Sequence, residues 1–171
     1  MHGFIKKLIV LPALAFCLFA GCSRPEEGSV EDTYSHPEEI SGYGITLTKD
    51  SSPEEVAALL IKGLDNEDTI LLKQLVAVKH EKKEMSAIYE RYGKESPVTL
   101  ESAANLAVKG WQMTYSFLAK GQTSITKTDI HGDTATVHAM AKGHVNFEDR
   151  YIRIKLIKED GWWKVAAGIE G

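Results

Sequence analysis

The chain has 171 residues, of which 43% are hydrophobic and 26% charged, proportions typical of an ordinary globular domain. Its 20 basic and 24 acidic side chains give a formal net charge of −4, which argues against nucleic acid as a main partner. Cys17 and Cys22 are its two cysteines, so the rest of the chain has no thiol for a disulfide, a metal thiolate or a cysteine nucleophile.

The first residues have the pattern of an export signal. Lys6 and Lys7 precede an apolar run of about 13 residues, whereas a helix that crosses a membrane needs roughly 20. Pro12 lies inside this run and weakens a permanent helix. The segment therefore predicts a removable signal peptide rather than a transmembrane anchor.

The end of the apolar run, Phe19-Ala20-Gly21-Cys22, resembles the lipobox of bacterial lipoproteins. The resemblance implies removal of residues 1–21, attachment of diacylglycerol to Cys22, and a cell-envelope protein held to its membrane by this lipid. Ser23 follows the cysteine, which in that family implies the outer membrane, facing the periplasm, in a Gram-negative cell. The alternative is an ordinary secretory signal with a chance cysteine.

Residues 22–44 are predicted to be the lipidated cysteine and a flexible tether, because they are rich in Pro, Gly and acidic side chains and poor in apolar ones. Loss of Lys6 and Lys7 with the signal leaves a net charge of −6, which argues against a broad basic surface on anionic lipid. The folded domain is predicted to span residues 45–171.

Four helices are predicted next. Ser52-Pro53-Glu54-Glu55 is a capping box with proline at the first helical position. Further helices are expected over residues 69–79, around 79–94 and from 99 to 118, before Gly121. The apolar positions expected to face the core are Val56, Leu59, Leu60, Leu64, Ile70, Leu71, Leu75, Val78, Met85, Ile88, Tyr89, Tyr92, Leu100, Ala104, Ala107, Trp111, Thr114 and Leu118.

The pattern changes to a period of two after Gly121. Residues 124–130, 135–142, 151–156 and 163–169 are predicted strands, separated by turns at 131–133, 146–149 and 159–161. Helices followed by a four-stranded antiparallel meander predict an α+β domain, with the helices packed on one face of the sheet.

Three segments carry a resemblance to a fold family. Residues 52–56 at the first helix, the acidic break 65–68 and the closing residues 159–165 look like the nuclear-transport-factor-two-like superfamily, which includes ketosteroid isomerases. The resemblance covers residues 52–169 and implies a bent, cone-like sheet with helices in its concave side. The chain departs from the pattern by an extra helix around residues 79–94, and the superfamily contains enzymes, binders and dimerisation modules.

Metal and catalytic motifs are weak. His80-Glu81-Lys82-Lys83-Glu84 has glutamate where a zinc-protease helix needs a second histidine. His138 and His144 are about 20 Å apart on one strand, too far to share an ion. Asp65 and Asp68 are explained by capping at a helix break. The sequence therefore predicts no metal, no cofactor and no catalytic residue.

Two candidate surfaces follow from the strand alternation. Small residues on the helix-facing side either admit the helices closely or leave room for a small apolar ligand. The opposite face gathers basic and aromatic side chains, which predicts a homodimer or protein interface, unless it is simply a half-solvated sheet. The pocket candidates are Trp111, Phe117, Ala139, Ala141 and Ala167, and the interface candidates are Tyr151, Arg153, Lys155, Trp162 and Lys164.

Adjacent strand residues point to opposite faces, so Trp162 is expected outside and Trp163 in the core. The favoured function is a lipid-anchored extracytoplasmic binding or protein-interaction module without enzymatic activity. The alternative is a small-molecule enzyme of the ketosteroid-isomerase-like class, which needs a carboxylate in an apolar pocket beside a hydrogen-bond donor.

Overall fold

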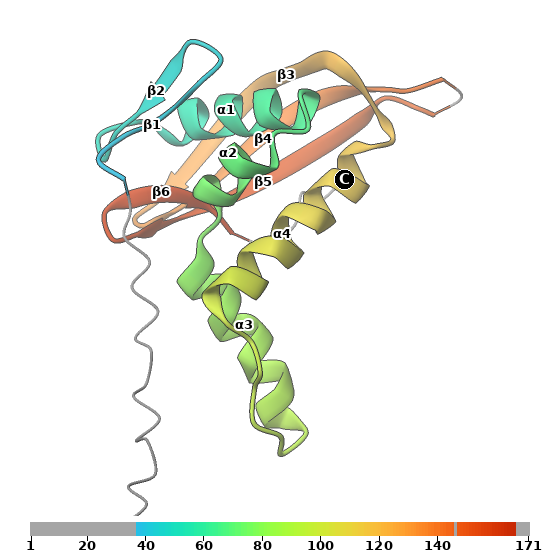
Figure 1. Ribbon diagram of the computed structural model, residues 1–171. Coiled ribbons are helices and arrows are strands. Elements are labelled where there is room, and N and C mark those ends of the chain that lie inside the picture. The colour runs from blue at the N-terminus through green and yellow to red at the C-terminus, as the bar shows by residue number, and fades with distance from the viewer. Residues whose placement is uncertain (1–36, 146, 167–171) are drawn as a thin grey trace, which may run out of the picture. The chain divides into compact units, whose positions relative to one another are not determined.

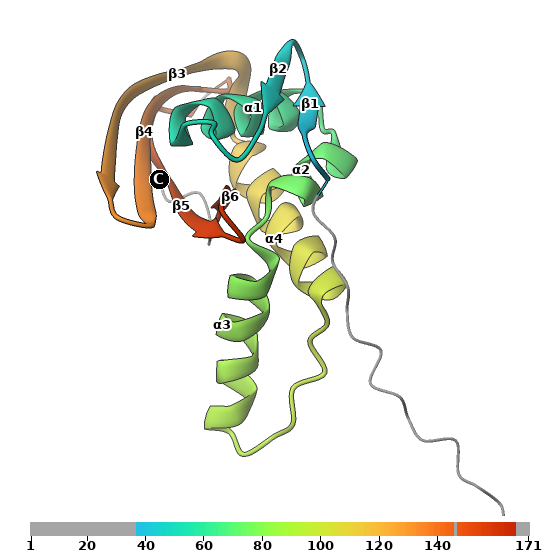
Figure 2. The same ribbon diagram turned by 90° about the vertical axis from the view of Figure 1, so that its left-hand side faces the viewer.

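The computed structural model describes residues 37–145 and 147–166. A small hairpin comes first, then four helices, then a four-stranded antiparallel sheet (Figure 1). The sheet curves around the first helix (Figure 2), so the predicted α+β fold with helices on a bent, cone-like meander is confirmed. Among the described residues, every helix is too short or too polar to cross a membrane.

The hairpin consists of β1 (Ile40–Gly42) and β2 (Ile45–Leu47). Tyr43 and Gly44 both have positive φ, the conformation of a tight two-residue hairpin turn. Ile40 and Leu47 pair with each other and are buried in the core. Residues 40–44 therefore belong to the fold, and the predicted tether extends too far at its C-terminal end.

The helices α1 (Pro53–Asp65) and α2 (Thr69–Leu75) begin at side-chain caps. Ser52 and Glu55 form the predicted capping box, and the Asp68 carboxylate accepts a hydrogen bond from the Leu71 amide. The helix expected to reach residue 79 ends at Leu75, because Val76 is extended and forms a parallel bridge with Val165. Ile70, expected in the core, is exposed.

The helix α3 (Val78–Arg91) projects from the body of the domain, whereas α4 (Leu100–Tyr115) crosses it (Figure 2). Ile88, Tyr89 and Tyr92 are exposed, so the prediction that this stripe lies in the core is wrong. The stripe has helical spacing, but the projecting half of α3 has no sheet beneath it. In α4 the predicted seam is largely confirmed, with Ala104 and Trp111 buried.

The sheet contains β3 (Leu118–His131), β4 (Thr134–Gly143), β5 (Arg150–Glu159) and β6 (Trp162–Val165), in that spatial order. Its first strand begins six residues earlier than predicted. The last strand ends at Val165. Ala166 is no longer part of it, and residues 167–169 of the predicted strand lie outside the described residues.

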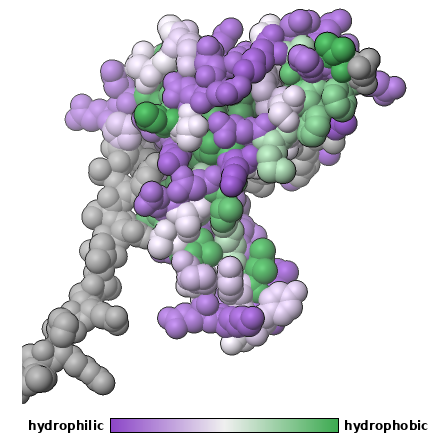
Figure 3. All heavy atoms as spheres, turned by 45° about the vertical axis from the view of Figure 1, so that its right-hand side comes forward, coloured by the Kyte–Doolittle hydropathy of each residue, from purple (hydrophilic) through white to green (hydrophobic). Residues whose placement is uncertain are grey.

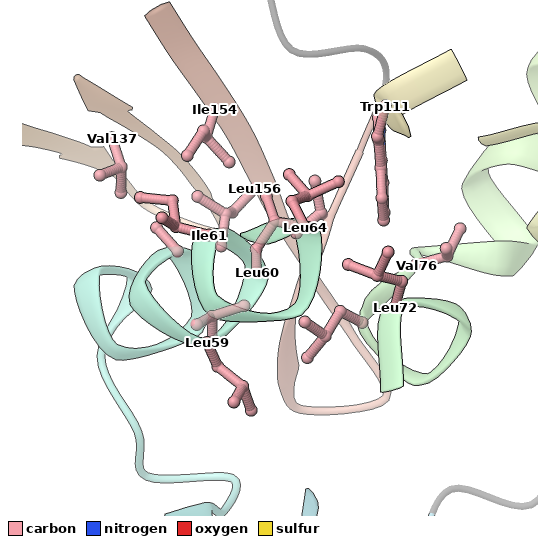
Figure 4. Packing of buried hydrophobic residues seen from close by; sticks show 14 of the residues in the cluster. Leu59, Leu60, Ile61, Leu64, Leu72, Val76, Trp111, Val137, Ile154 and Leu156 are labelled. Atoms are coloured by element: carbon pink, nitrogen blue, oxygen red, sulfur yellow. The ribbon is translucent and has the colours of Figure 1, made fainter. Parts of the chain in front are cut away.

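One hydrophobic core fills the concave side of the sheet. Figure 4 shows Leu60 and Leu64 of α1 beside Leu156 of β5, with Trp111 of α4 further along the same layer. Alternation along β4 and β5 sends every second residue into this core and the others to the convex side. The convex side of β3, β4 and β5 is therefore the sheet surface on which polar side chains can gather.

Candidate functional site

The convex side of the sheet carries a set of basic and aromatic side chains that we call the outer sheet face. Backbone pairing places His138 of β4 between Lys127 of β3 and Arg153 of β5. The next rows on the same face add Asp129 with Lys155, and Tyr151 with Met140. The outer sheet face is defined here by Lys127, Asp129, His138, Tyr151, Arg153 and Lys155.

Three of these side chains form a hydrogen-bonded row across the strands. Nε2 of His138 lies 3.0 Å from an Asp129 carboxylate oxygen, and its Nδ1 lies 2.5 Å from the Tyr151 hydroxyl. The His138 and Tyr151 rings also stack, with centroids 5.4 Å apart. Each side chain in the row is thus fixed by a neighbour on the next strand, which lowers the entropy lost when a partner binds.

The charges on this face are unequal. Hydrogen bonding to Lys127, whose Nζ lies 2.7 Å from the carboxylate, holds the pKa of Asp129 below its usual range, and His138 adds to this effect. The same contact with Asp129 raises the pKa of Lys127. Among the charged residues that define this face, Asp129 is acidic, whereas Lys127, Arg153 and Lys155 are basic. The face is therefore basic, although the protein has a negative net charge.

Tyr151, Arg153 and Lys155 are exposed on this face, as the alternation predicts. The other two interface candidates, Trp162 and Lys164, are wrong as surface residues, since their exposed fractions are 2% and 0%. Their orientation is right, because they pair with Glu159 and Ile157 on the convex side. The prediction of exposure is wrong because another part of the chain covers these two side chains.

The segment that joins α2 to α3 covers this end of the convex side. Nζ of Lys164 donates a 2.6 Å hydrogen bond to the carbonyl oxygen of Gln74. The Glu159 carboxylate accepts from the amides of Lys79 and His80, at 3.0 and 3.1 Å, in the first turn of α3. These partners are about 80 to 90 residues apart in sequence, so no local pattern reveals them.

Lys164 is a buried cation, although strand alternation predicts it on the surface. Burial lowers its pKa to about 8, although the nearby carboxylates of Glu159 and Asp160 act in the opposite direction. Its Nζ also lies 5.2 Å from the centroid of the Trp162 ring. Lys164 therefore joins the end of α2 to β6 on the covered part of the convex side.

The predicted pocket does not form from the residues named for it. Trp111, Ala139 and Ala141 are members of the continuous core. Phe117 is exposed and packs against Phe147, with ring centroids 5.3 Å apart, so its assignment to an internal pocket is wrong. Ala167 lies outside the described residues.

An open groove of about 670 Å³ lies instead at the C-terminal ends of α1 and α4, beside the start of β3. Its wall includes Glu67, Tyr115, Lys120 and His144. The Tyr115 hydroxyl donates a 2.9 Å hydrogen bond to the carboxylate of Asp65, and burial raises the pKa of Tyr115.

The Asp65 oxygen that accepts from Tyr115 also accepts from the amide of Gly121 at 2.9 Å. Asp65 thus fixes the end of α1 to α4 and β3. A base of the ketosteroid-isomerase kind needs an apolar enclosure, whereas this carboxylate is partly exposed and already hydrogen-bonded. The two hydrogen bonds to Asp65 account for the local arrangement of α1, α4 and β3.

The histidines singled out in the sequence are not brought together. His138 belongs to the outer sheet face, and His144 lines the open groove. Within residues 37–145 and 147–166, no group of three His, Cys, Asp or Glu side chains is placed to hold a metal ion.

Comparison with known proteins finds few matches. No protein-family model matches the chain, and no curated protein matches it. A crystal structure at 2.00 Å resolution, of an NTF2-like protein from Campylobacter jejuni named as a candidate transpeptidase, is similar to it. The two are 20% identical with a TM-score of 0.41, over 67% of this chain and 97% of that one.

Proposed function

We propose that the protein is a lipid-anchored interaction module of the cell envelope, without enzymatic activity, in the nuclear-transport-factor-two-like superfamily. The proposed location in the cell envelope rests on the lipobox-like Phe19-Ala20-Gly21-Cys22 and on the apolar run before it. Its superfamily rests on the order of elements and on helices packed in the concave side of a curved meander.

The outer sheet face carries the functional part of the proposal. It combines an exposed tyrosine with three cationic side chains, and the Asp129–His138–Tyr151 row holds part of it in a fixed arrangement. Tyrosine and arginine are enriched in interfaces, and a basic face favours a partner of opposite charge. The partner we propose is an acidic protein surface.

The lipid anchor is tested on the mature N-terminus. Mass spectrometry of the protein from a bacterial membrane fraction should find residues 1–21 removed and diacylglycerol on the sulfur of Cys22. Cys22→Ser should move the protein to the soluble fraction. An unmodified cysteine at the mature N-terminus contradicts this part of the proposal.

The binding face is tested with poly-L-glutamate as a model acidic chain, on the mature protein carrying Cys22→Ser. NMR titration should shift the signals of Tyr151, Arg153 and Lys155, and added salt should weaken binding. The double variant Arg153→Ala/Lys155→Ala should weaken binding about tenfold. Its matched control is Lys83→Ala/Lys94→Ala, which removes two exposed charges on and after α3.

The controls separate specific from general attraction. Equal weakening by the two double variants would show that only net charge matters, and would remove the outer sheet face from the proposal. Binding to anionic vesicles but not to poly-L-glutamate would replace the acidic protein by a lipid surface. Neither result bears on the lipid at Cys22, which is measured separately.

A further inference from the structure

One face of α4 is apolar and exposed. Leu106 and Met113 lie on it with Phe117, which follows the end of the helix, and Gly110 lies between them. Their spacing of four, three and four residues is the spacing of the apolar seam in a coiled coil. The opposite side of α4, with Val108 and Trp111, already faces the core.

The apolar surface continues onto the loop between β4 and β5. Phe147 packs on Phe117, and the amide of His144 donates to the carbonyl oxygen of Phe117, which holds the loop against the helix end. Figure 3 shows apolar side chains gathered over this loop. We define the α4 patch as Leu106, Gly110, Met113, Phe117, Val145 and Phe147, whose large side chains are between 45% and 72% exposed.

The size of the α4 patch fits an interface between two copies. Five side chains exposed to this extent present roughly 500 Å² of surface, at the upper end of what single-chain proteins leave uncovered. Two copies that bury the same patch would remove roughly 1,000 Å², the area at which a contact between two proteins becomes specific and which is typical of a weak, reversible pair.

The glycine at position 110 supports a second helix as the partner of this face. A glycine within a helix is destabilising relative to alanine, so it needs a reason. Space around Gly110 is open: apart from its chain neighbours and the backbone of its own helix, no atom lies within 4 Å of where a Cβ would be, so packing within one copy does not require a glycine. A glycine does matter where a second helix crosses, because the missing side chain lets the two backbones approach closely.

We propose that the α4 patch binds a second copy of this chain, with two α4 helices antiparallel about a two-fold axis beside Gly110. Leu106 lies four residues before the glycine and Met113 three after it, so the axis places Leu106 of one copy against Met113 of the other. A patch that matches itself closes the pair and leaves no open end for further copies. The α4 patch is a different surface from the outer sheet face, and the proposed pair does not depend on that face.

Lys109 gives the pair a measurable electrostatic signature. It lies next to Gly110, and a two-fold axis at the crossing brings the two Lys109 side chains to the same edge of the interface. Like charges repel and salt screens this repulsion. Dimerisation should therefore strengthen as salt is added, the opposite of the behaviour expected for an acidic partner on the outer sheet face.

Analytical ultracentrifugation of the mature chain carrying Cys22→Ser tests the pair. The protein should show a concentration-dependent monomer–dimer equilibrium, and Met113→Ser should weaken it at least about tenfold. Ile130→Ser is the matched control, because Ile130 is 54% exposed at the far end of β3, and it should leave the equilibrium unchanged.

Gly110→Ala gives a result that a structural role in the monomer would not. It should raise the midpoint of thermal unfolding of the dilute monomer, since alanine favours helix, while it weakens the dimer. Gly110→Cys adds a second test, because Cys22→Ser leaves the mature chain without thiols. Mild oxidation should join two copies through position 110, and Ile130→Cys should not do so.

A protein that stays monomeric up to about 1 mM would overturn the proposal, because that limit corresponds to negligible affinity. A dimer that tolerates both Met113→Ser and Gly110→Ala would also overturn it, since another surface would then be responsible. If Arg153→Ala/Lys155→Ala alone disrupted that dimer, the outer sheet face would be the dimer interface.

Discussion

Lys164 places an amino group in a fully buried position on the covered part of the convex side of the sheet. Its side chain is fully buried, and its Nζ is held by the carbonyl oxygen of Gln74 and by the face of the Trp162 ring. Burial disfavours the charged form, which is why the pKa falls to about 8. In the unfolded chain the same group keeps the ordinary lysine pKa, near 10.4.

This difference predicts that stability rises with pH above neutrality. Between pH 8 and about 10.4 the unfolded chain binds more protons at Lys164 than the folded one, so the free energy of unfolding increases as the pH rises. From pH 7.5 to 9.5 we expect a gain of about 2 kcal/mol from this group. Urea unfolding at the two pH values measures it.

Lys164→Met should remove this rise. Lys158→Met is its control, because Nζ of Lys158 lies at the same 5.2 Å from the ring of Trp163 but the residue is exposed. The control should keep the rise. A wild-type protein whose free energy of unfolding is flat across this range would contradict the buried cation.

At the level of single elements, α3 depends on a cap from the far end of the chain. Ala77, its N-cap residue, has no side-chain acceptor, and the carboxylate of Glu159 takes that place by accepting from two amides of the first turn. A negative group at a helix N-terminus also interacts favourably with the helix dipole.

Glu159→Gln should lower the free energy of unfolding by about 1 kcal/mol, because it removes the charge from both hydrogen bonds. Hydrogen exchange at the amides of Lys79 and His80 should become faster. Asp160→Asn removes the neighbouring charge and its exposed ion pair with Lys79, and should change stability by less than about 0.5 kcal/mol. Equal effects of the two changes would argue against the cap.

The strand β6 makes a second prediction. Because Trp162 is buried, Trp162→Ala should lower the free energy of unfolding by about 3 kcal/mol or more, as a core substitution does. Its indole N–H is buried without a hydrogen-bond partner among the described residues. Trp162→Phe also removes that N–H, but it loses much less buried volume than Trp162→Ala. Its free energy of unfolding should therefore remain within about 1.5 kcal/mol of that of the wild type. Urea unfolding of both variants checks this, and a harmless Trp162→Ala would contradict the burial.

Local sequence patterns predict several of these elements correctly and fail where a distant segment decides the structure. The sequence correctly predicts the capping box at Ser52, the alternation of β4 and β5, and the buried seam of α4, because each depends on residues close together in the chain. Strand parity was right even for Trp162 and Lys164. The burial of these two side chains could not be predicted from the sequence. It depends on the position of the segment between α2 and α3, which no local periodicity specifies.

The same reasoning explains the candidate sites. Tyr151, Arg153 and Lys155 were identified because alternation alone assigns a face. The Asp129–His138–Tyr151 row was missed because it needs the register between strands, which turn lengths and bulges set. Gly110 was overlooked because its significance depends on the space around it, which only coordinates reveal.

Across the whole molecule, stability should be uneven. The tip of α3 has exposed apolar side chains and no sheet beneath it, whereas α1 lies within the core. Hydrogen exchange of the native protein should therefore be fastest in the last two turns of α3 and slowest in α1. Equal protection of both helices would mean that α3 is covered in solution, and loss of that protection in Met113→Ser would assign the cover to the second copy.

The closing strand also determines when the domain can be completed during synthesis. Residues 74–80 leave the ribosome long before residues 159–165, yet Gln74, Val76, Lys79 and His80 find their partners there. Until the last strand emerges, the first turn of α3 has only water for its amides, and the core edge beside Val76 is open. Pairings this distant in sequence close slowly. A nascent chain of this protein therefore remains incompletely folded along this edge of the core until residues 159–165 have emerged and paired with residues 74–80.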